Sequence, residues 1–332
     1  MEKVKFATIG TSKITQNFID GTKISNKMVH SAIYSRTLAQ GEEFSRINGN
    51  LPVYTSLDEL CNADIDAVYV ASPNKFHYEQ SKFILEHGKH VICEKSISAQ
   101  PHQMEELVNI ASKNGLIFME ALMFMHLPSR HLLTEALGSI GNIKSVNLNF
   151  CQRSSRYDAY CNGELPNIFN PECETGALLD LGVYCVYPAL YYFGMPNKIH
   201  ATSSFLSSGV DGTGSVIMNY GDKLVTLNYS KLCQGMAPSQ FVGDNGCVTV
   251  DSISTLGGIK LYPLKGEVRN LRDGETKEEL MSHEAADFAD IIRNLNENKE
   301  LYELCTKTMI DCAHVMYEIR MQSGLYYPSD KK

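Results

Sequence analysis

The sequence lacks the excess of positive charge that nucleic-acid-binding proteins carry. Its 30 lysines and arginines are outnumbered by 38 aspartates and glutamates, which gives a net charge of −8. An acidic balance of this kind argues against a nucleic-acid partner. The opening residues, MEKVKFATIG, also lack the basic region and long apolar run of a signal peptide. We therefore expect a cytoplasmic protein that binds no nucleic acid.

None of the 10 cysteines belongs to a C-x-x-C pair, and no histidine stands at zinc-finger spacing from one. Such spacings are the usual signature of structural zinc sites and redox dithiols. A chain of 332 residues is also long enough to fold without disulfide staples. We expect no metal site and scattered, reduced thiols.

The chain has one nearly uncharged run of membrane-spanning length, Gly176–Met195, in which Asp180 is the single charge. The run contains three glycines and a proline, and it has no basic flank. A buried helix is therefore the better prediction, with no membrane contact. A buried carboxylate is costly without a partner, so Asp180 needs a specific role.

The composition is globular, with 43% hydrophobic residues, and the length predicts roughly two domains. Strand and helix patterns alternate through the first 120 residues, which predicts a parallel sheet with helices on both faces. The expected strands are Val4–Ile9, Val29–Tyr34, Val53–Tyr54, Ile65–Ala71, His90–Cys93 and Leu116–Met119; the expected helices are Ile14–Ile19, Thr37–Ile47, a capped turn from Ser56, Phe76–Glu86 and Pro101–Ser112.

The pattern changes after about residue 143, where short strands follow one another. This predicts a large, open, mostly antiparallel sheet with one face covered. We place a dinucleotide-binding domain at 1–122 and a substrate-binding and oligomerisation domain at 123–332; the alternative for the last two helices is that they pack back on the first domain. The expected elements are a strand over Ile143–Phe150, the apolar helix, strands near 198–206, 214–220, 223–230, 239–242, 246–250 and 259–262, and helices over Lys277–Leu295 and Glu303–Gln322.

The turn after the first strand, Gly10-Thr11-Ser12-Lys13-Ile14-Thr15, partly matches the dinucleotide fingerprint G-x-G-x-x-G/A. Ser12 and Thr15 replace the second glycine and the final Gly or Ala of that pattern. The context is the required one, because a helix start there can hold a pyrophosphate on its free N–H groups. We predict a Rossmann dinucleotide-binding domain; the alternative is a simple strand-to-helix turn.

The second strand ends without the carboxylate that normally binds the ribose hydroxyls of NAD. No Asp or Glu occurs between Asp20 and Glu42, and the strand ends at Ser35-Arg36-Thr37. An arginine there can stack on adenine and pair with a 2′-phosphate. This favours NADP(H) over NAD(H); the alternative is that Arg36 is a solvated surface charge.

Three further motifs carry a family resemblance. They are Gly88-Lys-His-Val-Ile-Cys-Glu94-Lys95, Ser72-Pro73-Asn74-Lys-Phe-His77 and Gly176-Ala-Leu-Leu-Asp180-Leu-Gly-Val-Tyr184. Together they resemble the GKHVxxEKP, TPNxxH and GGALxDxGxY motifs of the Gfo/Idh/MocA oxidoreductases, in that family's order. Tyr184 and the Glu120-Ala121 pair are most similar to the dihydrodiol dehydrogenase and NADP-dependent xylose dehydrogenase branch.

The sequence departs from the family pattern at four places. Ser96 replaces the proline that follows the lysine, and Thr175 replaces the first of two glycines. Met123 and Met125 stand where relatives often have an aromatic residue and an arginine. Because these two side chains could line the substrate pocket, the resemblance does not carry a substrate identity.

Hydride transfer from an alcohol needs a fixed nicotinamide, a group that takes the hydroxyl proton, and stabilisation of the developing charge. Lys95 lies just past a strand end, where α/β sheets bind ligands, and its ammonium can bond the reacting oxygen. We assign Tyr184 as the proton carrier, activated by Lys95 because a free phenol titrates near 10. Asp180 lies four residues before it on one helix face and would orient the substrate hydroxyls or the lysine.

Each assignment has a structural alternative. Glu94 and Lys95 could form a surface ion pair, and Tyr184 could pack in the core beside its neighbouring tyrosines. The predicted catalytic residues are Lys95, Tyr184 and Asp180. The predicted cofactor-binding residues are Gly10, Thr11, Ser12, Lys13, Ile14, Ser35, Arg36, Ser72, Pro73, Asn74, His77, Glu94 and Lys95. Those from Ser72 onward belong to the motifs that carry the resemblance.

His77 is expected near the cofactor by resemblance, although a lone histidine is more often structural. Arg153, Arg156 and Tyr157 follow the first strand of the second domain and could reach the cleft or could be solvated. The resemblance also implies a homodimer or homotetramer formed through the open sheet face, which we expect to be apolar.

The favoured function is an NADP(H)-dependent oxidoreductase acting on a sugar, a polyol or a vicinal diol. One alternative is a glycosidase that oxidises its sugar transiently and shows no net redox change. Another is a sensor that binds the cofactor without turnover. Net NADPH turnover separates the first from the second, and binding without turnover identifies the third.

Overall fold

The computed structural model describes residues 2–331 and divides into two units by its contacts. The first unit comprises the chain up to Ser98, with His102–His126 and Thr276–Lys307; the second comprises Ala99–Pro101, Leu127–Glu275 and the chain from Thr308 onward. Residues 123–126 and 276–307 therefore belong to the first unit by their contacts, and the predicted domain boundary at 122 stays a prediction. The Lys277–Arg293 helix packs in that unit, which the sequence left open as a possibility.

The first unit is built on a parallel sheet that has six strands within the described chain, in the order β3-β2-β1-β4-β5-β6. Strand order reverses between β1 and β4, and the carboxyl ends of strands at such a point form the usual ligand site of an open α/β sheet. All four residues of β4 are buried, as expected when helices cover both faces. The strands are β1 (Val4–Ile9), β2 (Met28–Tyr34), β3 (Val53–Tyr54), β4 (Ala67–Val70), β5 (His90–Glu94) and β6 (Phe118–Ala121).

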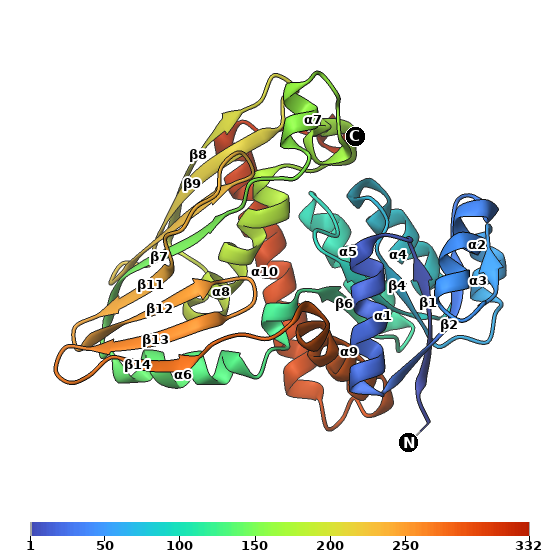
Figure 1. Ribbon diagram of the computed structural model, residues 1–332, viewed down its shortest axis with the longest axis horizontal. Coiled ribbons are helices and arrows are strands. Elements are labelled where there is room, and N and C mark those ends of the chain that lie inside the picture. Colours follow the sequence, from blue (N-terminus) through green and yellow to red (C-terminus); the bar gives the residue numbers. More distant parts are fainter. Residues whose placement is uncertain (1, 332) are drawn as a thin grey trace. The chain divides into compact units, whose positions relative to one another are not determined.

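Helices α1 and α9 lie side by side against this sheet (Figure 1). Helix α9 begins at a capping box, in which Thr276 and Glu279 each bond the other's backbone N–H. Met123–Met125 forms a short 3₁₀ turn that packs against α9. The helices of this unit are α1 (Lys13–Ser25), α2 (Leu38–Ile47), α3 (Leu57–Cys61), α4 (His77–Glu86), most of α5 (Pro101–Lys113) and α9 (Lys277–Arg293), with the start of α10 (Lys299–Ser323).

The second unit is built on a mixed sheet that has eight strands within residues 2–331, in the order β14-β13-β12-β11-β7-β10-β9-β8. Every neighbouring pair is antiparallel except β7 with β10, which confirms the predicted fold class. The strands are β7 (Ile143–Cys151), β8 (Lys198–Phe205), β9 (Asp211–Asn219), β10 (Leu224–Ser230), β11 (Ser239–Gly243), β12 (Gly246–Ser252), β13 (Gly257–Pro263) and β14 (Arg269–Arg272). The sequence analysis missed β14, whose charged residues give no apolar pattern.

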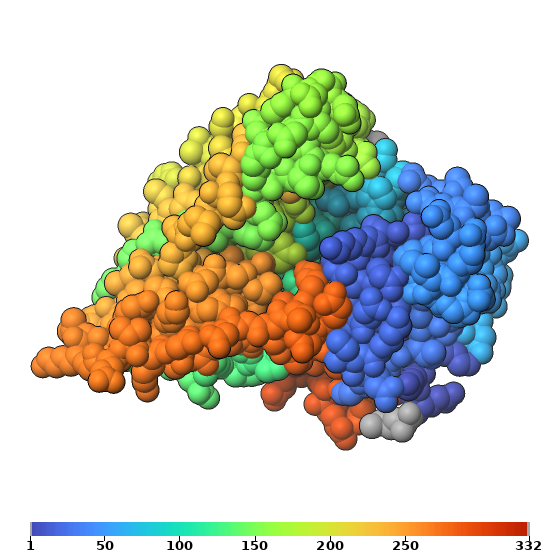
Figure 2. Space-filling model, in the orientation of Figure 1, coloured from blue at the N-terminus to red at the C-terminus, as the bar shows by residue number. Residues whose placement is uncertain are grey.

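One face of this sheet is covered by α8 (Val183–Phe193), which contacts β7 and β10. Helix α6 (Ser129–Ser139), which the sequence analysis did not predict, contacts β12, and α7 (Tyr157–Cys161) is a short helix after β7. The turn between β13 and β14 forms an exposed orange tip at the lower left of Figure 2, and Leu264 there is 71% exposed.

The other face of the sheet is mostly polar. Ser215 Oγ donates to Asn228 Oδ1 over 2.8 Å, and Asn228 Nδ2 donates to Asn149 Oδ1 over 3.3 Å. Ile217 is 44% exposed among these polar side chains. The expectation of an apolar face is therefore wrong, because the residues that alternate with the buried ones are largely amides and hydroxyls. Oligomerisation through this face remains a prediction.

The apolar run Gly176–Met195 is mostly buried, as predicted, but it is not one regular helix. Leu178–Gly182 forms a π-helical turn, and α8 follows from Val183. Asp180 lies in the π turn and Tyr184 in the α-helix, so the spacing argument for one shared α-helical face does not apply. Within residues 2–331, no helix combines the length and the apolar character needed to cross a membrane.

Candidate active site

The predicted dinucleotide turn connects β1 to α1 at the carboxyl end of the parallel sheet. Gly10 has a φ of +111°, and a Cβ there would lie 2.5 Å from the Ala71 carbonyl oxygen, so the position accepts only glycine. Ser12 is the N-cap residue of α1, and its side chain makes no capping bond to the helix backbone. The first N–H groups of α1 are thus open to an anionic ligand.

A cavity of about 200 Å³ opens beside this turn. Its lining includes seven of the predicted cofactor residues, together with side chains from the second strand and from the start of α4. The Arg36 guanidinium lies 5.5 Å from the centre of the Phe76 ring, in a position to stack and to carry charge. The lining is Ile9, Gly10, Thr11, Ser12, Tyr34, Ser35, Arg36, Gln40, Ala71, Ser72, Pro73, Phe76 and Gln80.

This lining fits a dinucleotide with a 2′-phosphate. Among the described residues that line the cavity, none is an aspartate or glutamate, and Arg36 is the cation at the end of β2. The predicted residues Lys13, Ile14, Asn74, His77, Glu94 and Lys95 do not line it. The sequence analysis missed Phe76 and Gln80, although Phe76 lies inside the Ser72–His77 motif and could have been considered.

His77 is buried between two backbone carbonyls. Its Nδ1 lies 3.1 Å from the Ser96 oxygen and its Nε2 lies 2.5 Å from the Ser72 oxygen. Burial lowers the pKa of His77 to about 4, so the ring is neutral at pH 7 and donates to one carbonyl at a time. His77 therefore joins the turn after β4 to the turn after β5, which is a structural position rather than a cavity-lining one.

The turn that presents Lys95 is held by groups at the ends of β4, β5 and β6. Ile97 N–H donates to Glu120 Oε1 over 3.3 Å. Glu94 accepts a 2.5 Å bond from the Tyr69 hydroxyl, and burial raises its pKa despite that bond and the charge of Lys95. Glu94 is thus a buried support beside Lys95, not an exposed partner in a surface ion pair.

Helix α9 adds two charged groups that the sequence analysis missed. Both carboxylate oxygens of Glu284 are buried and lack a hydrogen-bond partner within residues 2–331. Burial first, and then the charge of Glu94, raise the pKa of Glu284 well above its usual value. Lys277 Nζ donates to Met123 Sδ over 3.3 Å, so Met123 contacts a lysine. Neither Lys277 nor Glu284 belongs to a recognisable motif. Only the folded structure brings Lys277 to Met123 and Glu284 near Glu94.

In the second unit, Asp180 forms an ion pair with Lys231, which follows directly after β10. The Lys231 side chain is 8% exposed and that of Asp180 is 30% exposed. The carboxylate in the apolar run therefore has its required partner, as burial predicts. The sequence analysis did not select Lys231, which lies 51 residues from Asp180 and stands in no motif.

Tyr184 lies on α8, one residue past its start, with its ring against Phe150 of β7. The ring centres are 5.4 Å apart in an edge-to-face arrangement, which fixes the ring plane. Tyr184 is only partly buried, whereas the nearby Tyr187 is 1% exposed. The core-packing alternative thus describes Tyr187 better than Tyr184.

Asp211 of β9 fixes the turn that begins this motif. Its Oδ2 accepts a 2.7 Å bond from the Leu178 N–H. A Cβ on Gly176, whose φ is +145°, would lie 2.0 Å from Asp211 Oδ1, so only glycine lets the carboxylate approach. Burial raises the pKa of Asp211 to about 7, against the lowering effect of backbone N–H bonds and of the Lys231 charge. No motif or spacing in the sequence indicates that Asp211 binds the Leu178 N–H.

The two arginines after β7, Arg153 and Arg156, are exposed. Arg153 forms a bidentate pair with Asp158, at 2.6 and 3.1 Å, and its guanidinium lies 5.2 Å from the Tyr157 ring centre. Arg156 is exposed at the N-cap of α7. Within the described chain, His, Cys, Asp and Glu side chains form no group of three suited to a metal ion.

The comparisons agree with this geometry. Residues 4–122 match the model described as "Oxidoreductase family, NAD-binding Rossmann fold", and residues 134–249 match the GFO/IDH/MocA C-terminal domain. The chain is 36% identical over 330 residues to scyllo-inositol 2-dehydrogenase (NADP(+)) IolU of Bacillus subtilis (strain 168), covering 99% of each sequence. It is 26% identical to trans-1,2-dihydrobenzene-1,2-diol dehydrogenase of Xenopus laevis, covering 98% of this chain and 99% of the relative.

Among solved structures, the fold matches KijD10, a 3-ketoreductase from Actinomadura kijaniata in complex with NADP and TDP-benzene. The TM-score is 0.84 at 21% identity, covering 97% of this chain and 98% of that one, and a likeness at that identity concerns the fold alone. The predicted branch and the prediction of an NAD(P)-dependent dehydrogenase or reductase are confirmed. This chain belongs to the GFO/IDH/MocA oxidoreductase family.

Proposed function

We propose that this protein is an NADP(H)-dependent oxidoreductase that interconverts a hydroxyl and a carbonyl on a sugar, a polyol or a vicinal diol. The observation that carries the proposal is the cavity beside Gly10, which has Arg36 and no carboxylate among its described lining residues. IolU, which bears NADP(+) in its name, supports the cofactor choice. The named substrates of IolU and of the dihydrodiol dehydrogenases support the substrate class.

When bound, the nicotinamide supplies the hydride acceptor for oxidation and the hydride donor for reduction. In the oxidative direction, the substrate carbon loses a hydride and its hydroxyl loses a proton, and the C–O bond becomes a carbonyl. Tyr184 takes that proton, and it returns it when the reaction runs toward the alcohol. The ammonium of Lys95 bonds the reacting oxygen and stabilises negative charge on it and on the Tyr184 oxygen.

Asp180 acts as a fixed hydrogen-bond acceptor for a neighbouring substrate hydroxyl. Its ion pair with Lys231 supports this role, because a paired carboxylate stays ionised and holds one orientation. Glu94 and His77 hold the turns around Lys95 rather than touching the reactants.

The test is turnover by the purified, cofactor-stripped protein. NADP+ is added with scyllo-inositol, other inositols, monosaccharides, vicinal diols and simple glycosides, and NADPH formation and the organic product are both measured. The proposal predicts stoichiometric NADPH and ketone with at least one of these substrates. A cleaved glycoside without net NADPH would support the glycosidase alternative, and tight NADPH binding without any turnover would support the sensor alternative.

A further inference from the structure

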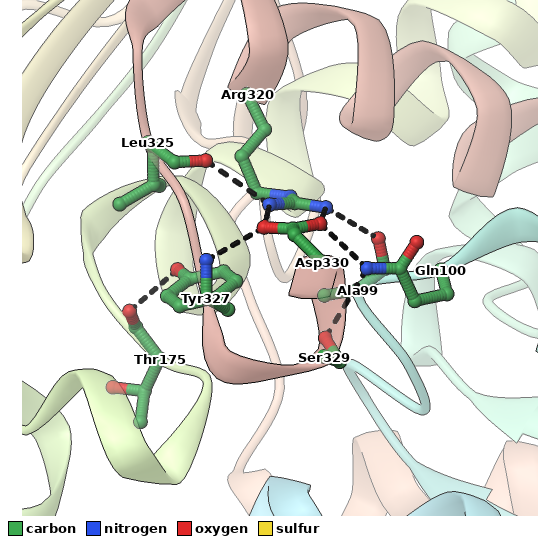
Figure 3. A network of polar contacts seen from close by, with 8 residues as sticks. All are labelled: Ala99, Gln100, Thr175, Arg320, Leu325, Tyr327, Ser329 and Asp330. Atoms are coloured by element: carbon green, nitrogen blue, oxygen red, sulfur yellow. Dashed lines mark hydrogen bonds and ion pairs between the residues drawn. The ribbon is translucent and has the colours of Figure 1, made fainter. Parts of the chain in front are cut away.

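The C-terminal segment folds back onto α10 and is fixed there by an ion pair between the buried Arg320 and the partly buried Asp330 (Figure 3). Helix α10 ends at Ser323, and Gly324 adopts a φ of +78°, which reverses the chain. Arg320, in the last turn of α10, is fully buried. Its guanidinium binds both carboxylate oxygens of Asp330, at 2.5 and 2.8 Å, and donates to the Leu325 carbonyl over 3.0 Å.

The Asp330 carboxylate collects two further donors. The Tyr327 N–H donates to it over 2.6 Å, and Gln100 Nε2 donates to it over 2.6 Å. Burial would raise the pKa of Asp330, but the bonds from Arg320, Tyr327 and Gln100 outweigh it, and the pKa is lowered. An ion pair with this many bonds holds one geometry, and removing Asp330 leaves the buried Arg320 charge uncompensated.

The same network reaches the two stretches of chain that flank the proposed catalytic residues. Arg320 Nη2 donates to the Ala99 carbonyl over 3.1 Å, and Ala99 and Gln100 follow Lys95 by only four and five residues. The Tyr327 hydroxyl donates to the Thr175 carbonyl over 2.6 Å. Thr175 directly precedes Gly176, whose carbonyl accepts the Asp180 N–H over 3.1 Å.

We propose that the segment Leu325–Asp330 is a positioning clamp for the proposed active site, and that Tyr327 is the residue through which it holds the start of the Asp180–Tyr184 motif. The inference rests on the proposed function for its effect on turnover. The turn at Thr175–Leu178 then has two long-range hydrogen bonds: the Leu178 N–H binds Asp211 of β9, and the Thr175 carbonyl binds Tyr327 of the C-terminal segment.

Neighbouring tyrosines provide a matched test. Tyr327 is 2% exposed, and Tyr326 is 61% exposed. Tyr327→Phe removes one hydroxyl and its bond to Thr175, while Tyr326→Phe removes a hydroxyl from the surface. We expect Tyr327→Phe to lower kcat about fivefold, the effect of one lost hydrogen bond, with the NADPH dissociation constant unchanged. Tyr326→Phe should match the wild type.

Hydrogen exchange of the backbone amides supplies a readout that does not depend on activity. In Tyr327→Phe, the amides of residues 176–184 should exchange about five to ten times faster, while those of β1 and α1 should keep their rates. Unchanged exchange over 176–184 would overturn the clamp, whether or not the protein turns over a substrate. A faster exchange in a protein without any turnover would support the clamp and contradict the proposed function.

Asp330→Asn offers a second variant, because it keeps the shape of the side chain and removes the charge that Arg320 binds. If this variant folds, exchange should accelerate over 176–184 at least as much as in Tyr327→Phe. An Asp330→Asn protein that folds and exchanges like the wild type over 176–184 would contradict the clamp. If Asp330→Asn does not fold, the exchange rates of Tyr327→Phe alone test the clamp.

Discussion

The two units of this protein hold their functional residues in different ways. In the first unit, the cofactor cavity is built largely by the turns that directly follow β1, β2 and β4, and each of these turns carries its own short sequence motif. In the second unit, the groups of the Asp180 motif are fixed by residues far away in the chain: the Asp180 carboxylate by Lys231, the Leu178 N–H by Asp211, and the Thr175 carbonyl by Tyr327. A nucleotide site can thus be recognised from local motifs, whereas a substrate site depends on pairs that only the fold brings together.

The largest expected effect belongs to the second unit and tests whether it carries the chemistry. Tyr184→Phe should lower kcat by about a hundredfold or more, the scale of lost general acid–base catalysis. The NADPH dissociation constant should not change, because the cofactor cavity lies in the first unit. Steady-state turnover and calorimetric titration measure the two quantities.

The matched control for Tyr184→Phe is Tyr262→Phe on the exposed side of β13, where Tyr262 is 39% exposed. It should leave both quantities unchanged. Full activity in Tyr184→Phe would show that Tyr184 is not the proton carrier. Weaker NADPH binding in that variant would show that the second unit also contributes to cofactor binding.

The second prediction concerns the long-range pair at Asp180. Lys231→Met should lower kcat/KM roughly ten- to a hundredfold, because a partly buried Asp180 loses its counter-charge and its fixed orientation. Lys231→Arg should restore part of that loss, since it keeps the positive charge. If Lys231→Met retains full kcat/KM, the ion pair is structural and the assignment of Asp180 needs revision.

The third prediction returns to the first unit. Arg36→Ala should weaken NADPH binding by about tenfold or more, the scale of one lost charged contact to a phosphate. NADH binding should change little, because NADH has no 2′-phosphate. Calorimetry with both cofactors provides the comparison, and an unchanged NADPH-to-NADH ratio would show that Arg36 is only a surface charge.

The smallest expected effect is a pH dependence of stability that originates at Asp211. Its pKa is about 7 in the folded protein, above the usual value of 3.8, so the folded state binds a proton more tightly than the unfolded state does. Ionisation of Asp211 therefore costs stability as the pH rises from about 4 to about 7. Asp211→Asn removes this cost.

The melting temperature of the Asp211→Asn variant, relative to the wild type, should therefore increase by a few degrees from pH 5 to pH 8. Thermal melts of both proteins across this range measure the difference. A difference that is constant with pH would mean that Asp211 is ionised throughout, and that its bond to Leu178 outweighs its burial.

The sequence predicted the parallel sheet of the first unit and several of the turns at its carboxyl edge. Alternating strands and helices gave the parallel sheet, and Gly10, Ser12, Arg36 and Ser72 line the cavity beside it. The buried run around Asp180 was also predicted, because a lone carboxylate in apolar surroundings has few explanations. These features follow from patterns that span a few turns of chain.

What the sequence did not predict depends on tertiary contacts. Lys231, Asp211 and Tyr327 reach their partners across dozens of residues, and no spacing rule identifies them. Glu284 and Lys277 on α9 look like the solvated face of a helix, but the fold buries Glu284 and brings both charges near Glu94. The π turn at Leu178–Gly182 was likewise hidden, because a hydrophobic run does not reveal its hydrogen-bond pattern.

The most direct test of the account is a calorimetric titration of the cofactor-stripped protein with NADPH and with NADH, in the wild type and in Tyr184→Phe. The account predicts that both proteins bind NADPH with the same affinity and bind NADH more weakly, because cofactor selection is a property of the first unit alone. Tighter binding of NADH, or no binding of either cofactor, would contradict the assignment of the Gly10–Arg36 cavity as an NADP(H) site.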